Sequence, residues 1–165
     1  MKGFSLLETL VAVGILIGAV LGPLSLASSS INAASLAKNQ IIAANLAAEA
    51  MEVARNKRDS NIFQGVDWLS GFSSCLEPGF CFLDMSQISP YDYEIGSCAP
   101  DCPALKRNPA NGLFNVGTGE ETGFVRKITM ASLASGEVRV RVEVSWKEKN
   151  STPSFVLETY LFRWH

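Results

Sequence analysis

One acidic residue, Glu8, lies near the start of a long apolar stretch that contains no charged residue between Leu10 and Leu26. An ionised carboxylate within a membrane-length helix costs about 2.5–3.5 kcal/mol on insertion scales, so its presence needs a functional reason, such as pairing with a cation. The plainer alternative is a carboxylate that reaches the membrane interface or takes up a proton. Glu8 is the first candidate site residue, and its expected chemistry is ion pairing inside an apolar layer.

Four cysteines, and no others, lie within one stretch in the pattern C-x5-C-x16-C-x3-C, at Cys75, Cys81, Cys98 and Cys102. Four cysteines allow three pairings. Short loop closure favours Cys75–Cys81 and Cys98–Cys102, each bond adding about 2–4 kcal/mol of stability. A zinc site is the alternative, although the paired C-x2-C spacing is missing. Disulfides would place this region outside the cytoplasm.

Four acidic residues fall in the same region, at Asp84, Asp92, Glu94 and Asp101. Their oxygens could bind calcium, but no ordered loop pattern is present, so a solvated acidic loop is the preferred interpretation and no cofactor is expected. The only histidine, His165, ends the sequence. A histidine-based catalytic triad is not expected, and we predict that the chain is not an enzyme. A net charge of -2 does not suggest nucleic-acid binding.

The apolar stretch, residues 4–27, is long enough to cross a membrane. As a helix it would measure about 36 Å, against an apolar bilayer core of about 30 Å. Gly14, Gly18 and Gly22 recur every fourth position and predict a flat strip on which a second helix can pack closely. Pro23 predicts a kink or a loosened turn.

The remaining elements predict an α+β fold. An alanine-rich amphipathic helix is expected over residues 28–57, continuous with the apolar stretch and ending near residues 56–61. Residues 58–123 are predicted to be a disulfide-bearing loop region with one short strand near residues 91–95. Apolar and polar side chains alternate over residues 138–147, and the stretches 124–132 and 155–164 are rich in β-branched and aromatic residues. Residues 124–165 are therefore predicted to form an antiparallel sheet covered by the helix. Residues 28–165 would form one extracytoplasmic globular domain.

The run Gly3-Phe4-Ser5-Leu6-Leu7-Glu8, followed by Thr-Leu-Val-Ala-Val, resembles the class III signal of type IV pilins and type II secretion pseudopilins. The resemblance implies that prepilin peptidase removes residues 1–3 after Gly3 and that Phe4 becomes N-methylated. It also implies that Glu8 pairs with the α-ammonium of Phe4 in an adjacent subunit during assembly. The helical stretch at residues 39–55 is similar to that of minor pilins and minor pseudopilins.

The same resemblance implies a structural subunit, with a minor one favoured, of a pilus or pseudopilus. The expected partners are other pilin or pseudopilin subunits, prepilin peptidase, the inner-membrane assembly platform and, before assembly, membrane lipid. The precursor would cross the inner membrane once, with Lys2 on the cytoplasmic side. The mature chain would then join an extracytoplasmic filament at the periplasm or cell surface.

A second targeting hypothesis rests on Ser25-Leu26-Ala27, an acceptable site for ordinary signal peptidase. The mature protein would then begin near Ser28. It would be a secreted or membrane-anchored β-rich binding module whose loops, at residues 61–123, contact a ligand. The mature N-terminus, Phe4 or Ser28, distinguishes the two hypotheses.

Overall fold

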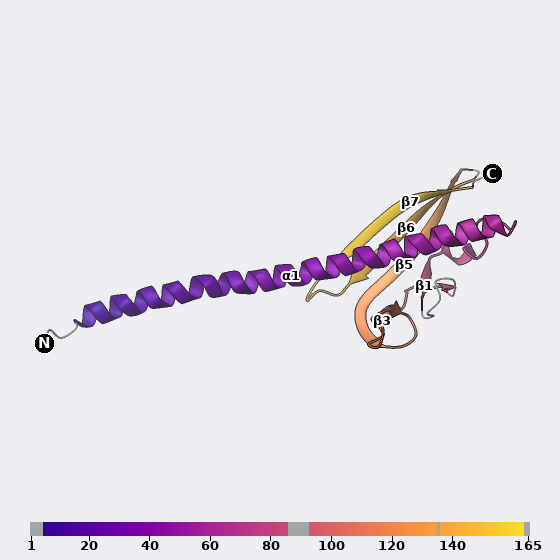
Figure 1. Cartoon of the computed structure of the whole chain (residues 1–165). Coiled ribbons are helices and arrows are strands. Elements are labelled where there is room, and N and C mark those ends of the chain that lie inside the picture. The colour runs from indigo at the N-terminus through magenta and orange to yellow at the C-terminus, as the bar shows by residue number, and fades with distance from the viewer. Residues whose placement is uncertain (1–4, 86–92, 135, 164–165) are drawn as a thin grey trace. The chain divides into compact units, whose positions relative to one another are not determined.

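The computed structural model describes residues 5–85, 93–134 and 136–163 (Figure 1). It contains one long helix, a short 3-10 helix and an antiparallel sheet. The chain divides into two compact units, Met1–Asn39 and Gln40–His165. The elements, in chain order, are α1 (Leu6–Phe63), η1 (Ser73–Cys75), β1 (Cys81–Asp84), β2 (Glu94–Ser97), β3 (Ala104–Arg107), β4 (Phe114–Asn115), β5 (Glu120–Ala134), β6 (Glu137–Trp146) and β7 (Ser154–Phe162).

The first unit is the N-terminal part of α1. The helix is continuous through Pro23, so the proline does not end it. Proline removes one backbone donor, and the neighbouring turns keep their own hydrogen bonds. This α1 segment is long and apolar enough to cross a membrane, and it is the one such helix among the described residues.

The second unit is built around a seven-stranded sheet. β5, β6 and β7 form an antiparallel meander. β5 pairs with β6 from Phe124↔Trp146 to Ala134↔Glu137, and β6 pairs with β7 from Glu137↔Phe162 to Ser145↔Ser154. The opposite side of β5 pairs with two short strands, β1 and β3, which in turn pair with β2 and β4. β5 is therefore the central strand of the sheet.

The core lies between this sheet and residues 40–63 of α1. Small side chains on one helical face, including Ala43, Ala47, Ala50 and Ala54, are buried in the same cluster as the sheet's apolar side chains. Their spacing of three to four residues forms one stripe, and their size lets the helix approach the sheet closely. The predicted α+β arrangement, a helix packed on an antiparallel sheet, is thus present.

Two local expectations differ from the structure. α1 continues to Phe63, beyond the end that was expected near residues 56–61. The Asn61 amide donates to the carbonyls of Trp68 and Ser70, at 3.2 and 2.8 Å, and Gly65 has φ +70°, a conformation that suits glycine beyond a helix end. The turn chemistry after residue 61 therefore determines where the helix stops.

The region expected to be loops, residues 58–123, also contains β1 to β4. These strands have two to four residues each, which is too short for an alternating pattern to be visible. They pair with each other and with β5, so their register comes from tertiary contacts. The single strand predicted there is β2, which begins at Glu94; residues 86–92 lie outside the described part of the chain.

Candidate functional site

Glu8 lies in the first turn of α1. The Ser5 carbonyl accepts hydrogen bonds from the Glu8 and Thr9 backbone N–H groups, at 3.0 and 3.2 Å, so the helical ladder begins at Ser5. The Thr9 hydroxyl donates to the Leu6 carbonyl at 2.9 Å. Two other predicted site residues, Gly3 and Phe4, lie outside the described residues. Glu8 therefore presents its carboxylate at the very start of the apolar helix.

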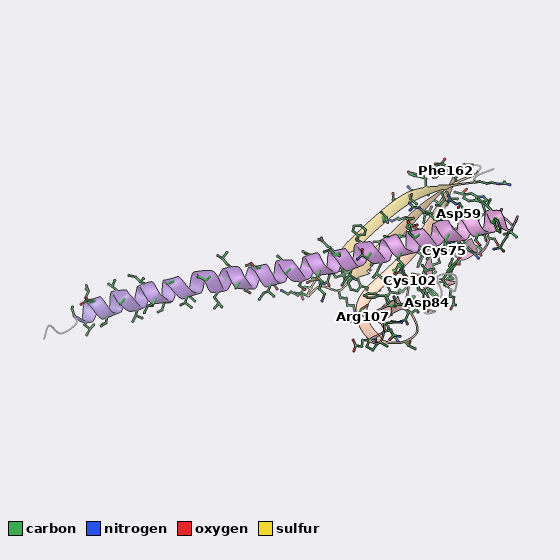
Figure 2. All side chains as sticks on the ribbon, viewed as in Figure 1. Asp59, Cys75, Asp84, Cys102, Arg107 and Phe162 are labelled. Atoms are coloured by element: carbon green, nitrogen blue, oxygen red, sulfur yellow. A yellow bond between two sulfur atoms is a disulfide. The ribbon has the colours of Figure 1, made fainter. Side chains whose placement is uncertain are left out.

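The side chains of the first unit are exposed along its length, and Figure 2 shows them standing away from the helix axis on every side. The segment is strongly apolar, and none of its membrane-length apolar part is buried in the described structure. Exposed apolar surface of this extent marks contact with membrane or protein. The exposed large apolar residues of this unit are Leu6, Leu7, Leu10, Val11, Val13, Ile15, Leu16, Ile17, Val20, Leu21, Leu24, Leu26, Ile31 and Leu36.

The three glycines of this segment lie on open helix surface. A Cβ atom added at Gly14, Gly18 or Gly22 would meet nothing within 4 Å. Their absence of side chains is therefore not required by packing within the chain. A strip of small residues is the feature that allows a second helix to approach.

In the second unit, Arg126 of β5 joins the helix to the sheet. Its Nη1 donates to the Leu46 carbonyl of α1 at 3.0 Å and to Oε1 of Glu49 at 3.2 Å. Its Nη2 donates to the Leu83 carbonyl of β1 at 2.8 Å. Arg126 is 1% exposed. One buried side chain thus connects α1, β5 and β1.

Nearby carboxylates offset part of the cost of burying the Arg126 charge. Burial lowers the pKa of Arg126, and the charge and hydrogen bond of Glu49, with the charge of Asp84, act in the opposite direction. Glu49 remains partly exposed, whereas Asp84 is buried and accepts a hydrogen bond from the Val116 backbone N–H at 3.0 Å. Arginine stays protonated in proteins, so the site holds a permanent cation beneath the helix.

Sequence reasoning missed Arg126, although a signal was present. Phe124, Arg126, Ile128 and Met130 alternate along β5 and all are buried. The period of two therefore placed one arginine on the inward face of a strand, where a charged side chain needs partners.

The structure contains two disulfides, Cys75–Cys81 and Cys98–Cys102, which is the local pairing that loop closure favoured. Cys75 and Cys102, one from each bond, are labelled in Figure 2. No cysteine of the chain remains free, so the zinc alternative is wrong. The disulfides close short loops beside β1 and β2 and are consistent with an extracytoplasmic location.

The acidic residues do not form a calcium site among the residues described. Asp84 and Glu94 are opposite each other in the β1–β2 register, while Asp101 follows Cys98 in the next loop. No group of three or more potential metal ligands is found in the described residues. Asp92 lies outside them. Asp84 therefore acts in the structure as a hydrogen-bond acceptor for Val116 and a counter-charge for Arg126.

In comparisons with known proteins, no family model, curated protein or solved structure matches the chain. A functional proposal must therefore rest on the residues themselves. The molecule has an exposed apolar helix with one carboxylate in its first turn. It also has a separately packed α+β unit, in which Arg126 connects α1, β5 and β1 by hydrogen bonds.

Proposed function

We propose that the chain is a structural subunit, and a minor one, of a type IV pilus or a type II secretion pseudopilus. In this proposal prepilin peptidase cuts between Gly3 and Phe4, and Phe4 is then N-methylated. The α1 helix first crosses the inner membrane and later packs among the helices of neighbouring subunits. The second unit stays outside the cytoplasm.

The position of Glu8 carries the proposal. It is the only charged residue of α1 before Lys38, and it lies in the helix's first turn, four residues after Phe4. The α-ammonium that cleavage would create at Phe4 and the Glu8 carboxylate are opposite charges at the same end of the helix. Pairing between adjacent subunits would neutralise both within an apolar layer and fix their axial offset.

The exposed apolar surface supports the same proposal. Lipid and other helices are equally apolar surroundings, so the segment can exchange one for the other without exposing its side chains to water. The glycine strip offers close contact to a neighbouring helix. Arg126 also supports a structural role, because its hydrogen bonds hold residues 46 and 49 of α1 to the central strand of the sheet.

The mature N-terminus tests the processing step. Intact-mass analysis of the full chain from a host with prepilin peptidase should show loss of residues 1–3 with a methyl group added. Gly3→Val should leave the precursor uncut, because a side chain there obstructs the extended backbone that a protease cleft takes. A mature chain recovered from Gly3→Val, or a wild-type chain that keeps Met1, would contradict the assignment.

The alternative binding module with an ordinary signal peptide predicts a different terminus. Its cleavage site, Ser25-Leu26-Ala27, lies inside α1, which continues unbroken on both sides. A protease would have to unwind the helix there. Detection of Ser28 as the first residue in the same mass measurement would favour this alternative.

A further inference from the structure

The connection between β6 and β7 contains the sequence Asn150-Ser151-Thr152. Asparagine followed by any residue except proline, and then by serine or threonine, is the acceptor motif of N-glycosylation. Asn150 is the only one of the chain's nine asparagines that fits this motif. Pro153 follows the motif and does not occupy its middle position. Short motifs also occur by chance, so the conformation of this segment is the relevant evidence.

The motif lies at the tip of a tight turn at one end of the sheet (Figure 1). The Glu148 N–H donates to the Ser151 carbonyl at 2.9 Å, and the Ser151 N–H donates to the Glu148 carbonyl at 2.8 Å. Lys149 and Asn150 are therefore the two central residues of the turn, and both are exposed. Nε1 of Trp146 donates to the Glu148 carboxylate at 3.2 Å. The turn thus has an anchored base and an exposed tip.

Asparagine is common in turns for two structural reasons, and neither explains Asn150. The first is its tolerance of positive φ. In the described part of the chain Lys149 is the one non-glycine residue with positive φ, at +47°. The second is a hydrogen bond between its side chain and the nearby backbone. In this turn the Ser151 hydroxyl makes such a bond, donating to the Glu148 carbonyl at 3.1 Å. The turn itself therefore does not require an asparagine at position 150.

The two side-chain groups that the motif provides are accessible. Asn150 and Thr152 are both exposed. Within the described residues, neither the Asn150 amide nor the Thr152 hydroxyl has a hydrogen-bond partner. An enzyme can therefore reach both groups without first breaking a side-chain hydrogen bond of either residue.

The expected compartment also suits this modification. N-glycans belong to surface loops of secreted proteins. The disulfides Cys75–Cys81 and Cys98–Cys102 are consistent with an extracytoplasmic second unit. Of the proposed function, the inference rests on this location alone. The filament subunit and the alternative binding module share it.

We propose that Asn150 carries an N-linked glycan, transferred from a lipid-diphosphate-linked oligosaccharide. Nδ2 of Asn150 attacks C1 of the first sugar and forms the new C1–N bond. The bond between C1 and the diphosphate oxygen breaks, and the lipid diphosphate leaves with its electron pair. The amide nitrogen gives one proton to a base of the transferase, and nothing is oxidised or reduced. The Thr152 hydroxyl is the group by which the transferase recognises this acceptor.

The mass of the full chain, isolated from the cells that produce it, tests the proposal. The wild type should exceed the mass of its mature polypeptide by the mass of a glycan. An amidase that removes N-glycans should leave aspartate at position 150. Asn150→Gln keeps a neutral amide but is not an acceptor, so it should carry no addition. The N-terminal peptide reports processing separately, which distinguishes a missing glycan from a failure of the cut after Gly3.

Four further variants test whether the motif itself is read. Thr152→Val removes the hydroxyl at nearly the same side-chain size and should abolish the glycan, whereas Thr152→Ser should retain it. Ser151→Ala removes a hydrogen bond of the turn but leaves the motif intact, so the glycan should remain. Asn111 is the matched control, because it is also exposed in a turn but has Leu113 two residues later. Asn111→Gln should leave the added mass unchanged.

Three results would overturn the proposal. The first is a wild-type chain with the mass of the polypeptide alone. The second is an added mass that persists in Asn150→Gln, which would place the modification at another residue. The third is equal modification of Thr152→Val and Thr152→Ser, which would show that the transferase does not read the hydroxyl. None of these results depends on whether the chain assembles into a filament.

Discussion

Replacing Arg126 with methionine should destabilise the second unit, because the side chain is the shared donor for α1 and β1. Methionine is similar in length and apolar, so it fills much of the same space. The variant loses the bonds to the Leu46 and Leu83 carbonyls, at 3.0 and 2.8 Å. Glu49 can turn to water because it is partly exposed.

The magnitude follows from two opposing effects. A hydrogen bond from a charged donor contributes roughly 1.5–3 kcal/mol, so two such bonds contribute about 3–6 kcal/mol. Replacing a buried charge by an apolar side chain recovers part of this, on the order of 1–3 kcal/mol, because the guanidinium no longer has to be desolvated. We expect a net loss of about 2–3 kcal/mol. Arg126→Ala should cost more, since it also leaves a cavity.

Urea unfolding of the full chain in detergent, followed by tryptophan fluorescence, measures this loss. Trp68 and Trp146 belong to the core and report on its opening. Arg139→Met on the outer face is the matched control and should change stability by less than about 0.5 kcal/mol. If Arg126→Met were as stable as the parent chain, or more stable, the guanidinium would not be what holds α1 to the sheet.

Two further predictions concern the loop residues Gly119 and Tyr93. Gly119→Ala should lower stability by about 2–4 kcal/mol in the same urea titration, since Gly119 has φ +131° and a Cβ there would overlap the Arg107 backbone. Gly117→Ala should be near neutral, because its Cβ would make only an ordinary contact with Oδ1 of Asn115 at 3.8 Å; equal effects would contradict this. Burial raises the pKa of Tyr93, so its stabilising contribution is complete below pH about 10 and is lost as the pH rises through the folded-state pKa. Tyr93→Phe should flatten that alkaline loss, and an unchanged pH profile would contradict it.

The main elements of the fold could be predicted from the sequence because their patterns extend over many residues. The alternation from Val138 to Trp146 continues through the whole of β6, and the inward side chains are buried as the pattern predicts. The helix was also predicted, but not which of its faces is buried: the packed stripe runs from Ala43 to Ala54. An alternating strand shows its buried face in the local sequence, whereas an alanine-rich helix has small side chains on several faces.

Other features depend on contacts that no local pattern records. The strands β1 and β3 are four residues long and obtain their register from β5. The end of α1 depends on Asn61 reaching carbonyls seven and nine residues later. Arg126 was visible as an inward position, but its partners at Leu46 and Leu83 are 80 and 43 residues away. Distant partners of this kind emerge only from the folded chain.

The candidate site also has one part that the local sequence predicts and one part that depends on distant partners. Glu8 was identified from one charge in an apolar run, and the structure places it in the first turn of α1. Its proposed counter-charge belongs to another subunit, so no contact within the chain could identify it. Gly3 and Phe4 remain predictions from the sequence motif.

The distribution of processed chain between membrane and sheared filament tests the central claim most directly. It should be measured for the wild type, Glu8→Gln and the control Thr9→Ser in a host with the assembly machinery. The account predicts that all three are cut after Gly3, but that Glu8→Gln stays in the membrane, because it lacks the charge that pairs with the Phe4 α-ammonium. Recovery of processed Glu8→Gln in filaments at the wild-type level would contradict it.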